Sequence, residues 1–169
     1  YRFPTIFNNR IAFVSEDNLW QVDTNNKIAY RLTGNLSPLH TPYFSPDGKF
    51  IAYIGAEDGN TEIYLIPSQG GLAKRLTYEG AFISKIASWD KNNIIYASDL
   101  NQPFGRISEL RKINIKDAQS ESMQFGVSSN IAISKNFTVL GRNTQDPARW
   151  KRYKGGTAGE LWVDLKNDF

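Results

Sequence analysis

Short apolar segments alternate with polar turns along the whole chain, and the pattern is clearest in its second quarter. Four segments with strand-like composition follow one another there, at residues 41–44, 50–54, 62–66 and 73–77. The turns between them contain Pro46, Gly48 and Gly59, residue types that favour the dihedral angles of tight turns. The pattern predicts four strands joined by three short turns, which is an antiparallel meander.

The same pattern recurs along the chain. Arg31-Leu32-Thr33 returns as Arg75-Leu76-Thr77, and Ile11-Ala12-Phe13 returns as Ile51-Ala52-Tyr53. The copies are therefore about 40 to 44 residues apart, which is the length of a four-stranded propeller blade. Because a blade cannot bury both of its faces alone, it needs a neighbour on either side. The sequence thus predicts an all-β fold, a β-propeller of four-stranded antiparallel blades.

The repeat divides residues 1–169 into four blades, at approximately 1–36, 37–80, 81–126 and 127–169. Strands are predicted in the first blade at 5–7, 10–14, 19–22 and 29–32, and in the fourth at 130–133, 138–141 and 160–165. The fourth blade thus lacks an outer strand. Propellers use about four to eight blades, and we expect an incomplete ring, about four blades of six, cut from a longer protein. No segment has helical periodicity beyond two turns.

The composition limits the kinds of catalytic and metal-binding sites that the chain can form. The sequence has no cysteine and one histidine, His40, so thiolate chemistry is excluded and a metal site is not expected. We expect no cofactor and no catalytic residue, because no serine lies in a G-x-S-x-G motif and His40 is interpreted as a loop residue. No apolar run reaches the roughly eighteen residues of a membrane span. The formal net charge of +3 permits an anionic partner without requiring one.

One stretch, at residues 142–158, interrupts the repeat. It combines aromatic residues with five cations: Arg142, Arg149, Lys151, Arg152 and Lys154. The simplest interpretation is a long inter-strand loop whose aromatic side chains pin it to its own blade and whose cations are solvated. A second is binding of a peptide carboxylate or an acidic partner, because guanidinium groups match carboxylate geometry. Nucleic acid is not expected as a partner, since the net charge is small and the cations are confined to one loop.

At this loop the sequence resembles the N-terminal six-bladed propeller of the tricorn protease family. The resemblance rests on Gly141-Arg142-Asn143-Thr144, on Trp150-Lys151, Tyr153, Gly155-Gly156-Thr157, Gly159 and Trp162, and on segments 17–20 and 99–104. It extends over the whole chain. The 45–49 turn is less specific, because TolB-like and prolyl-oligopeptidase-like propellers share it. Two alternatives therefore stay open, a TolB-like protein-binding propeller and the propeller cap of a prolyl-oligopeptidase-type α/β-hydrolase.

The resemblance implies a function. Tricorn-like enzymes are cytoplasmic serine peptidases that trim oligopeptides released by the proteasome, and they assemble as homohexamers. Their propellers act as gates or channels, while their catalytic residues lie in a distant C-terminal region. This chain is therefore expected to be a non-catalytic part of a hydrolase, with oligopeptides as its partners. Its inner strands, including segments 41–44 and 83–87, would line the channel.

The chain departs from the family before its third blade. There the family carries a pair of arginines associated with the substrate's C-terminal carboxylate, whereas this chain has Tyr78-Glu79-Gly80-Ala81-Phe82. The resemblance then implies that Lys85, or the cluster Arg149–Lys154, supplies the charge, or that this homologue has a different preference. The candidate substrate-binding residues are Lys85, Arg142, Arg149, Lys151, Arg152 and Lys154.

Overall fold

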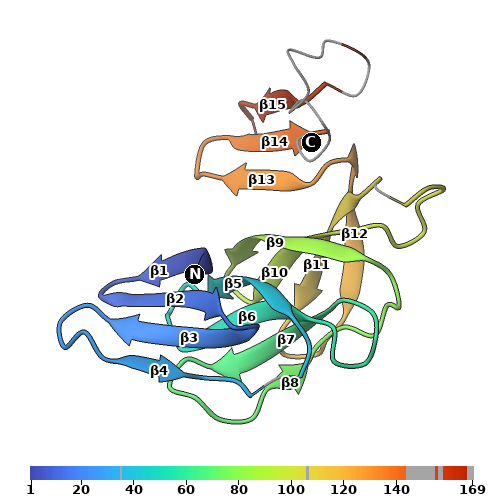
Figure 1. The fold of residues 1–169 in the computed structure, drawn as a ribbon. Coiled ribbons are helices and arrows are strands. Elements are labelled where there is room, and N and C mark those ends of the chain that lie inside the picture. The colour runs from blue at the N-terminus through green and yellow to red at the C-terminus, as the bar shows by residue number, and fades with distance from the viewer. Residues whose placement is uncertain (35, 106, 144–154, 156–157, 167–169) are drawn as a thin grey trace.

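A computed structural model describes residues 1–34, 36–105, 107–143, 155 and 158–166. Within these residues the chain forms strands and no helix, and the strands group into four sheets in chain order, which we call blades 1 to 4 (Figure 1). Blade 1 contains β1 (Arg2–Phe7), β2 (Arg10–Ser15), β3 (Asn18–Asp23) and β4 (Ala29–Arg31). Blade 2 contains β5 (Leu39–Phe44), β6 (Phe50–Gly55), β7 (Glu62–Pro67) and β8 (Lys74–Arg75). Blade 3 contains β9 (Ile83–Asp90), β10 (Asn93–Ser98), β11 (Glu109–Asn114) and β12 (Ser120–Val127). Blade 4 contains β13 (Asn130–Ile133), β14 (Thr138–Arg142) and β15 (Glu160–Asp164).

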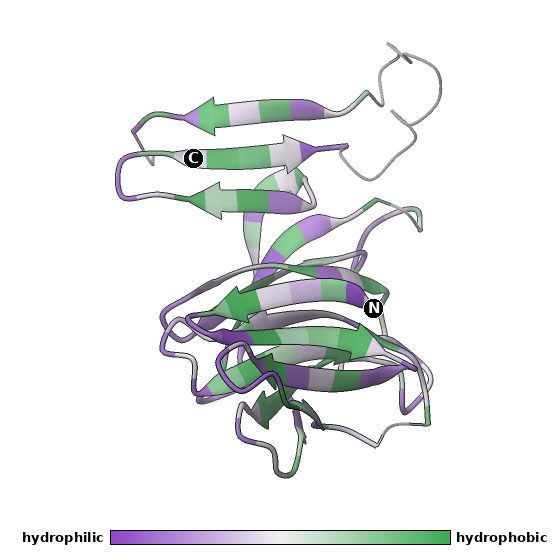
Figure 2. Ribbon diagram, turned by 60° about the vertical axis from the view of Figure 1, so that its left-hand side comes forward, coloured by the Kyte–Doolittle hydropathy of each residue, from purple (hydrophilic) through white to green (hydrophobic). Residues whose placement is uncertain are grey.

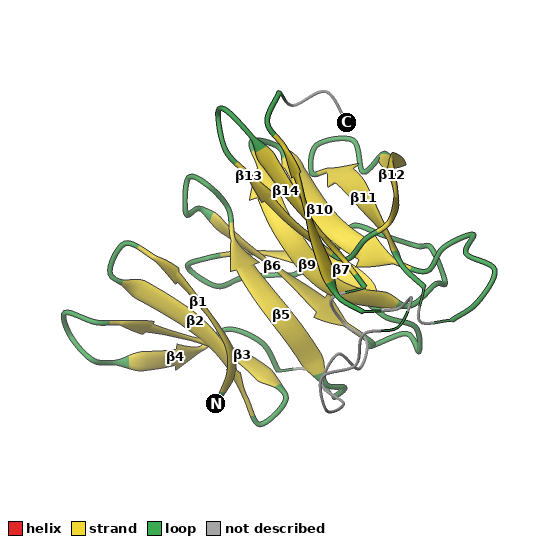
Figure 3. Cartoon of the chain, turned by 90° about the horizontal axis from the view of Figure 1, so that it is seen from above, coloured by secondary structure: helices red, strands yellow, loops and turns green. Residues whose placement is uncertain are grey.

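Every blade is a simple meander, in which each strand pairs antiparallel with the next one along the chain. Seen from above, blade 1 lies on the left, blade 2 follows it, and the strands of blades 3 and 4 overlap beyond blade 2 (Figure 3). The first strands of the four blades, β1, β5, β9 and β13, contact one another in that order. Each of them is an edge strand of its sheet. The predicted all-β propeller architecture is therefore confirmed.

The core consists of three apolar layers, one between each pair of successive blades. Between blades 1 and 2 the layer includes Val14 and Leu19 on one side and Ile51 and Tyr53 on the other. The layer between blades 2 and 3 is built around Trp89, and a smaller layer joins blades 3 and 4. Figure 2 shows the corresponding hydrophobic stretches along the strands, with polar residues in the turns. Burial of these layers holds the blades together, as expected for units that cannot each form a core alone.

The repeated Arg-Leu-Thr motif has a structural cause. In blade 2 the Leu76 N–H donates to the Ile63 carbonyl at 2.8 Å, and the Ile63 N–H donates to Thr77 Oγ1 at 2.8 Å. In blade 1 the Leu32 N–H donates to the Leu19 carbonyl at 2.7 Å, and the Leu19 N–H donates to a threonine hydroxyl at 2.9 Å. The threonine thus continues the hydrogen-bond ladder by one step beyond the short outer strand, and its leucine fills the inter-blade layer.

No helix within the described ranges is long and apolar enough to cross a membrane.

Candidate functional site

The inner strands bring polar side chains from different blades together. Lys85 lies on β9 and is half-buried, and its ammonium donates a hydrogen bond to Asn130 Oδ1 on β13 of the next blade. Burial lowers the pKa of Lys85. In the part of the chain that the structure describes, no carboxylate forms an ion pair with it. A lysine that carries three N–H donors and lacks an acidic partner is suited to bind a carboxylate from outside.

Two inner strands are bent by irregular residues. Phe3 in β1 and Thr41 in β5 both have positive φ, 52° and 44°, and each lies where the pairing with the second strand shifts register. A β-branched residue in this region is strained, so the surrounding contacts must hold it there. Thr41 Oγ1 accepts a hydrogen bond from the Ile86 N–H of β9 at 3.4 Å, which joins the inner edges of blades 2 and 3.

The first strand begins earlier than the sequence predicted, because the irregular pairing interrupts the apolar pattern. The sequence predicts this strand at 5–7, whereas β1 begins at Arg2 and continues through the irregular pairing. Alternation of apolar and polar residues is disturbed at a bulge, because the extra residue shifts the side-chain period. The apolar pattern therefore identified only the regular half of the strand.

His40 does not lie in a loop as its sequence context suggested. It belongs to β5, where its side chain is half-buried, with the ring centroid 6.0 Å from that of Phe3 on β1. Burial, and secondarily the charge of Arg2, lowers its pKa. Its Nδ1 atom lies 3.4 Å from the hydroxyl of Thr41, the next residue in the chain. These contacts hold the imidazole at the seam between blades 1 and 2.

The other predicted cations divide into two groups. Arg142 ends β14, its Nε–H donates to the Val127 carbonyl at 3.1 Å, and its guanidinium carbon lies 4.2 Å from the centre of the Trp162 ring. It therefore stacks within its own blade at the start of the basic loop. The remaining four candidates, Arg149, Lys151, Arg152 and Lys154, lie outside the described residues.

Sequence analysis missed a buried acidic residue in the linker between blades 2 and 3. The Glu79 carboxylate accepts hydrogen bonds from the Tyr96 hydroxyl at 2.5 Å, the Ser120 hydroxyl at 3.0 Å and the Ser98 hydroxyl at 3.2 Å. Its Oε1 atom also lies 3.3 Å from Arg111 Nε, and both side chains are almost fully buried. The linker is thereby fixed to the middle of blade 3. The partners come from distant parts of the chain, so no local pattern could have shown the cluster.

A second buried acid, Glu62 on β7, completes this arrangement. Its carboxylate pairs with Arg75 at 3.0 Å and accepts the backbone N–H groups of Glu79 at 3.3 Å and of Gly80 at 3.1 Å. The two acids therefore hold the linker from both blades. This linker leads directly into β9, so its fixed position determines where Lys85 stands.

Comparison with known proteins shows which family the chain belongs to. The sequence model of the Tricorn protease N-terminal beta propeller domain matches residues 1–168 of this chain. The chain belongs to this family. Of the three kinds of propeller considered from the sequence, the tricorn propeller is supported by this sequence match, whereas two TolB structures match at 14% and 18% identity, which shows the fold alone.

Individual tricorn relatives are also similar to this chain over nearly its whole length. The chain is 36% identical over 168 residues to a putative Tricorn-like protease N-terminal subunit of Sulfurisphaera tokodaii, covering 96% of this chain and 85% of that protein. It is 35% identical over 168 residues to a tricorn protease homolog of Saccharolobus solfataricus, covering 96% of this chain and 16% of that protein. The crystal structure of the tricorn protease matches with a TM-score of 0.83 and 28% identity, covering 98% of this chain and 17% of that one. The chain thus spans most of one tricorn relative and about a sixth of the others.

Proposed function

We propose that this propeller is the non-catalytic portion of a tricorn-like serine peptidase and acts as a gate or channel for oligopeptides. The peptides would come from the proteasome, and the full-length protein would work in the cytoplasm as a homohexamer. The observation that carries the proposal is the match to the tricorn propeller family over residues 1–168. The inner-strand geometry described above supports the channel role.

Edge strands explain how a channel could handle peptides of any sequence. Within the described residues each inner strand pairs with one neighbour in its sheet, so its other side carries backbone groups that lie outside the ladder. An extended peptide can bond to such groups regardless of its side chains. Lys85 would add attraction for carboxylates, since its ammonium has donors beyond the one given to Asn130. A folded chain cannot present its backbone in this way.

The end blades support the expectation of a larger ring. Strand alternation directs Ile6, Phe13 and Trp20 of blade 1 to the face opposite the core layer shared with blade 2. On blade 4, Leu161 and Val163 are 72% and 54% exposed. We propose that two further blades cover these faces, which gives a six-bladed ring.

A measurement on the full-length gene product tests the function. We expect a very large particle in analytical ultracentrifugation that hydrolyses short peptides, is stopped by a serine-directed inhibitor and leaves a folded protein intact. A small inert particle, or one that degrades folded and unfolded substrates at equal rates, would contradict the proposal.

Lys85→Gln tests the role of the inner-strand cation. For peptides with a free C-terminal carboxylate, we expect KM to rise about tenfold with kcat unchanged, because a charge-assisted hydrogen bond is lost at a site remote from catalysis. C-terminally amidated peptides should show no change. Lys112→Gln is the matched control, since this lysine lies in the same blade and already pairs with Glu121 at 3.0 Å. An equal effect of both variants would argue against a specific role for Lys85.

A further inference from the structure

A pocket recurs at the same place on blades 1, 2 and 3. In each blade the first residue of the second strand lines it, at the position where that strand begins its pairing with the third. The paired residues at this register position are Arg10 with Asp23, Phe50 with Pro67, and Asn93 with Asn114. In each blade a backbone hydrogen bond ties the two neighbouring turns together, at 2.8 Å in blades 1 and 2 and 2.9 Å in blade 3. The pockets therefore have walls of fixed shape, and their chemistry differs only through the side chains.

The pocket of blade 1 has an arginine, Arg10, in its wall. The Arg10 guanidinium lies between the rings of Phe7 and Phe44, at 5.4 and 5.5 Å from their centroids. It donates to the Gly48 carbonyl at 2.7 Å and to the Ser68 hydroxyl at 2.8 Å. These bonds fasten blade 1 to blade 2 and use the charge within the protein.

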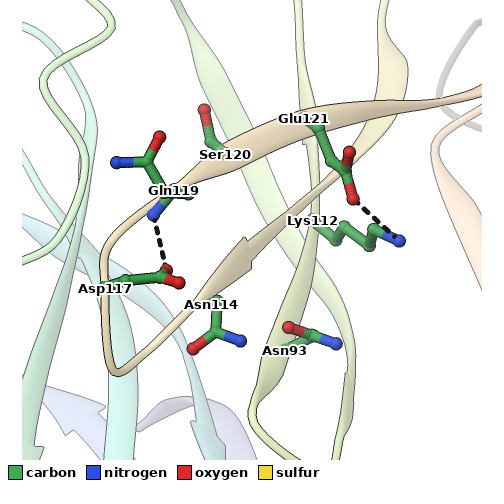
Figure 4. Close-up of a pocket in the computed structure, with 7 residues that line it drawn as sticks. All are labelled: Asn93, Lys112, Asn114, Asp117, Gln119, Ser120 and Glu121. Carbon is green, nitrogen blue, oxygen red and sulfur yellow. Dashed lines mark hydrogen bonds and ion pairs between the residues drawn. The ribbon is translucent and has the colours of Figure 1, made fainter.

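The pocket of blade 3 is polar throughout (Figure 4). Amide, hydroxyl and charged side chains line it: Asn93, Lys112, Asn114, Asp117, Gln119, Ser120 and Glu121. Its lysine and glutamate form an ion pair at 3.0 Å, and the Asp117 carboxylate accepts the Gln119 N–H at 3.0 Å. The charges in this pocket are thus already satisfied from within the blade.

The pocket between blades 2 and 3 is different because it has an apolar floor. Phe50 and Ile115 pack there against the inter-blade core, and Leu65 belongs to that core. At the two register positions where blade 1 has Arg10 and Gln21, blade 2 has Phe50 and Leu65. The cavity has a volume of about 530 Å³, within the range of roughly 300 to 1,000 Å³ that is typical of small-ligand pockets.

Three lysines surround this apolar floor with one carboxylate among them. Lys49 pairs with Asp47 at 3.4 Å, and that carboxylate also accepts the Ser45 hydroxyl at 2.7 Å and so belongs to the turn. Lys91 and Lys116 lie on neighbouring turns of blade 3, and within the described ranges neither forms an ion pair. An apolar floor with two uncompensated ammonium groups at its rim complements a ligand with an apolar body and a negative end.

We propose that the pocket between blades 2 and 3 binds an amphipathic carboxylate, with the apolar group on Phe50, Leu65 and Ile115 and the carboxylate at Lys91 and Lys116. The ligand is either a free aromatic or branched-chain acid or the C-terminal residue of a peptide. This site does not include Lys85 and does not depend on the channel function, because the turns that follow β5, β9 and β11 line it.

Calorimetry on the full chain tests the proposal with two acids and their neutral counterparts. Phenylacetate and phenylacetamide represent the free ligand, and acetyl-Ala-Phe and its C-terminal amide represent the peptide. We expect the acids to bind more tightly than the amides. The acid that binds more tightly identifies the source of the ligand.

Two variants locate the binding. The double substitution Lys91→Gln and Lys116→Gln should weaken binding of the acid about tenfold. A matched double substitution of exposed lysines elsewhere, Lys27→Gln and Lys166→Gln, should leave it unchanged. Leu65→Gln, which introduces the residue that blade 1 carries at this position, should reduce affinity for phenylacetate while circular dichroism confirms the fold. Equal loss in both lysine variants, equal affinity for phenylacetamide, or no binding at millimolar ligand would overturn the proposal.

Discussion

Two buried tyrosine hydroxyls provide a matched test of the Glu79 cluster. Tyr96 is fully buried, and its hydroxyl donates to the Glu79 carboxylate at 2.5 Å. Tyr64 is 5% exposed, and within the described residues its hydroxyl has no hydrogen-bond partner. The substitutions Tyr96→Phe and Tyr64→Phe each remove one oxygen atom from a buried ring on neighbouring blades. Only the first removes a hydrogen bond.

The structure sets the size of the expected difference. A hydrogen bond to a charged group contributes about 1.5 to 3 kcal/mol to stability. Because Glu79 keeps its contacts with Ser98, Ser120 and Arg111, we expect Tyr96→Phe to lower the free energy of unfolding by about 2 kcal/mol. For a chain of this length that corresponds to a fall in Tm of about 4 to 8 °C. Tyr64→Phe should change stability by less than about 0.5 kcal/mol or increase it, since an unpaired buried hydroxyl is unfavourable.

Urea unfolding of the purified chain, followed by tryptophan fluorescence, measures both changes. Burial, together with the negative charge of Glu79, raises the pKa of Tyr96, so this hydroxyl stays a donor at neutral and mildly alkaline pH. The difference between the two variants should therefore be the same at pH values of about 6 to 9. Equal destabilisation by both substitutions, or a larger loss for Tyr64→Phe, would refute the assignment of Glu79 as the stabilising centre of the linker.

Substitutions at three further positions, two of them with a control substitution, test other parts of the fold. Thr77→Ala should lower the free energy of unfolding by about 1 kcal/mol, because a buried backbone N–H loses its acceptor, and Thr77→Ser should restore most of it in urea titrations. The lowered pKa of His40 means that the unfolded chain binds more protons, so stability should fall as pH drops below about 6.5, and Tm measured from pH 7.5 to 5 should fall less in His40→Gln. Gly48→Ala should destabilise by more than about 2 kcal/mol, because φ is +67° and a Cβ would lie 2.2 Å from the Phe7 ring. Gly59→Ala is its control, since φ is +101° there with nothing within 4 Å, and about 1 to 2 kcal/mol is expected for it in the same titration.

The sequence alone predicted the fold because the blade signal is local. Alternating apolar residues, turns with proline and glycine, and the returning Arg-Leu-Thr motif all lie within one repeat, and each has its counterpart in a strand, a turn or a threonine hydrogen bond. Other short motifs, in segments 17–20, 99–104 and 141–162, led to the tricorn family, to which the chain belongs. They were less informative where a strand departs from regular pairing, as at Phe3 and Thr41.

The candidate site was only partly accessible from sequence. Lys85 was predicted as a candidate because it lies at the start of the third blade. Its contact with Asn130 joins two blades, and the sequence of neither segment alone indicates it. The buried partners of Glu79 lie as far away as Ser120, and the pocket at Lys91 and Lys116 takes part of its floor from blade 2. The repeat period and the apolar alternation thus determined the strands and turns within each blade, because both reflect backbone geometry over a few residues. Which charges are buried, paired or left open at the seams was decided only by the stacking of the blades, because those contacts join residues far apart in the chain.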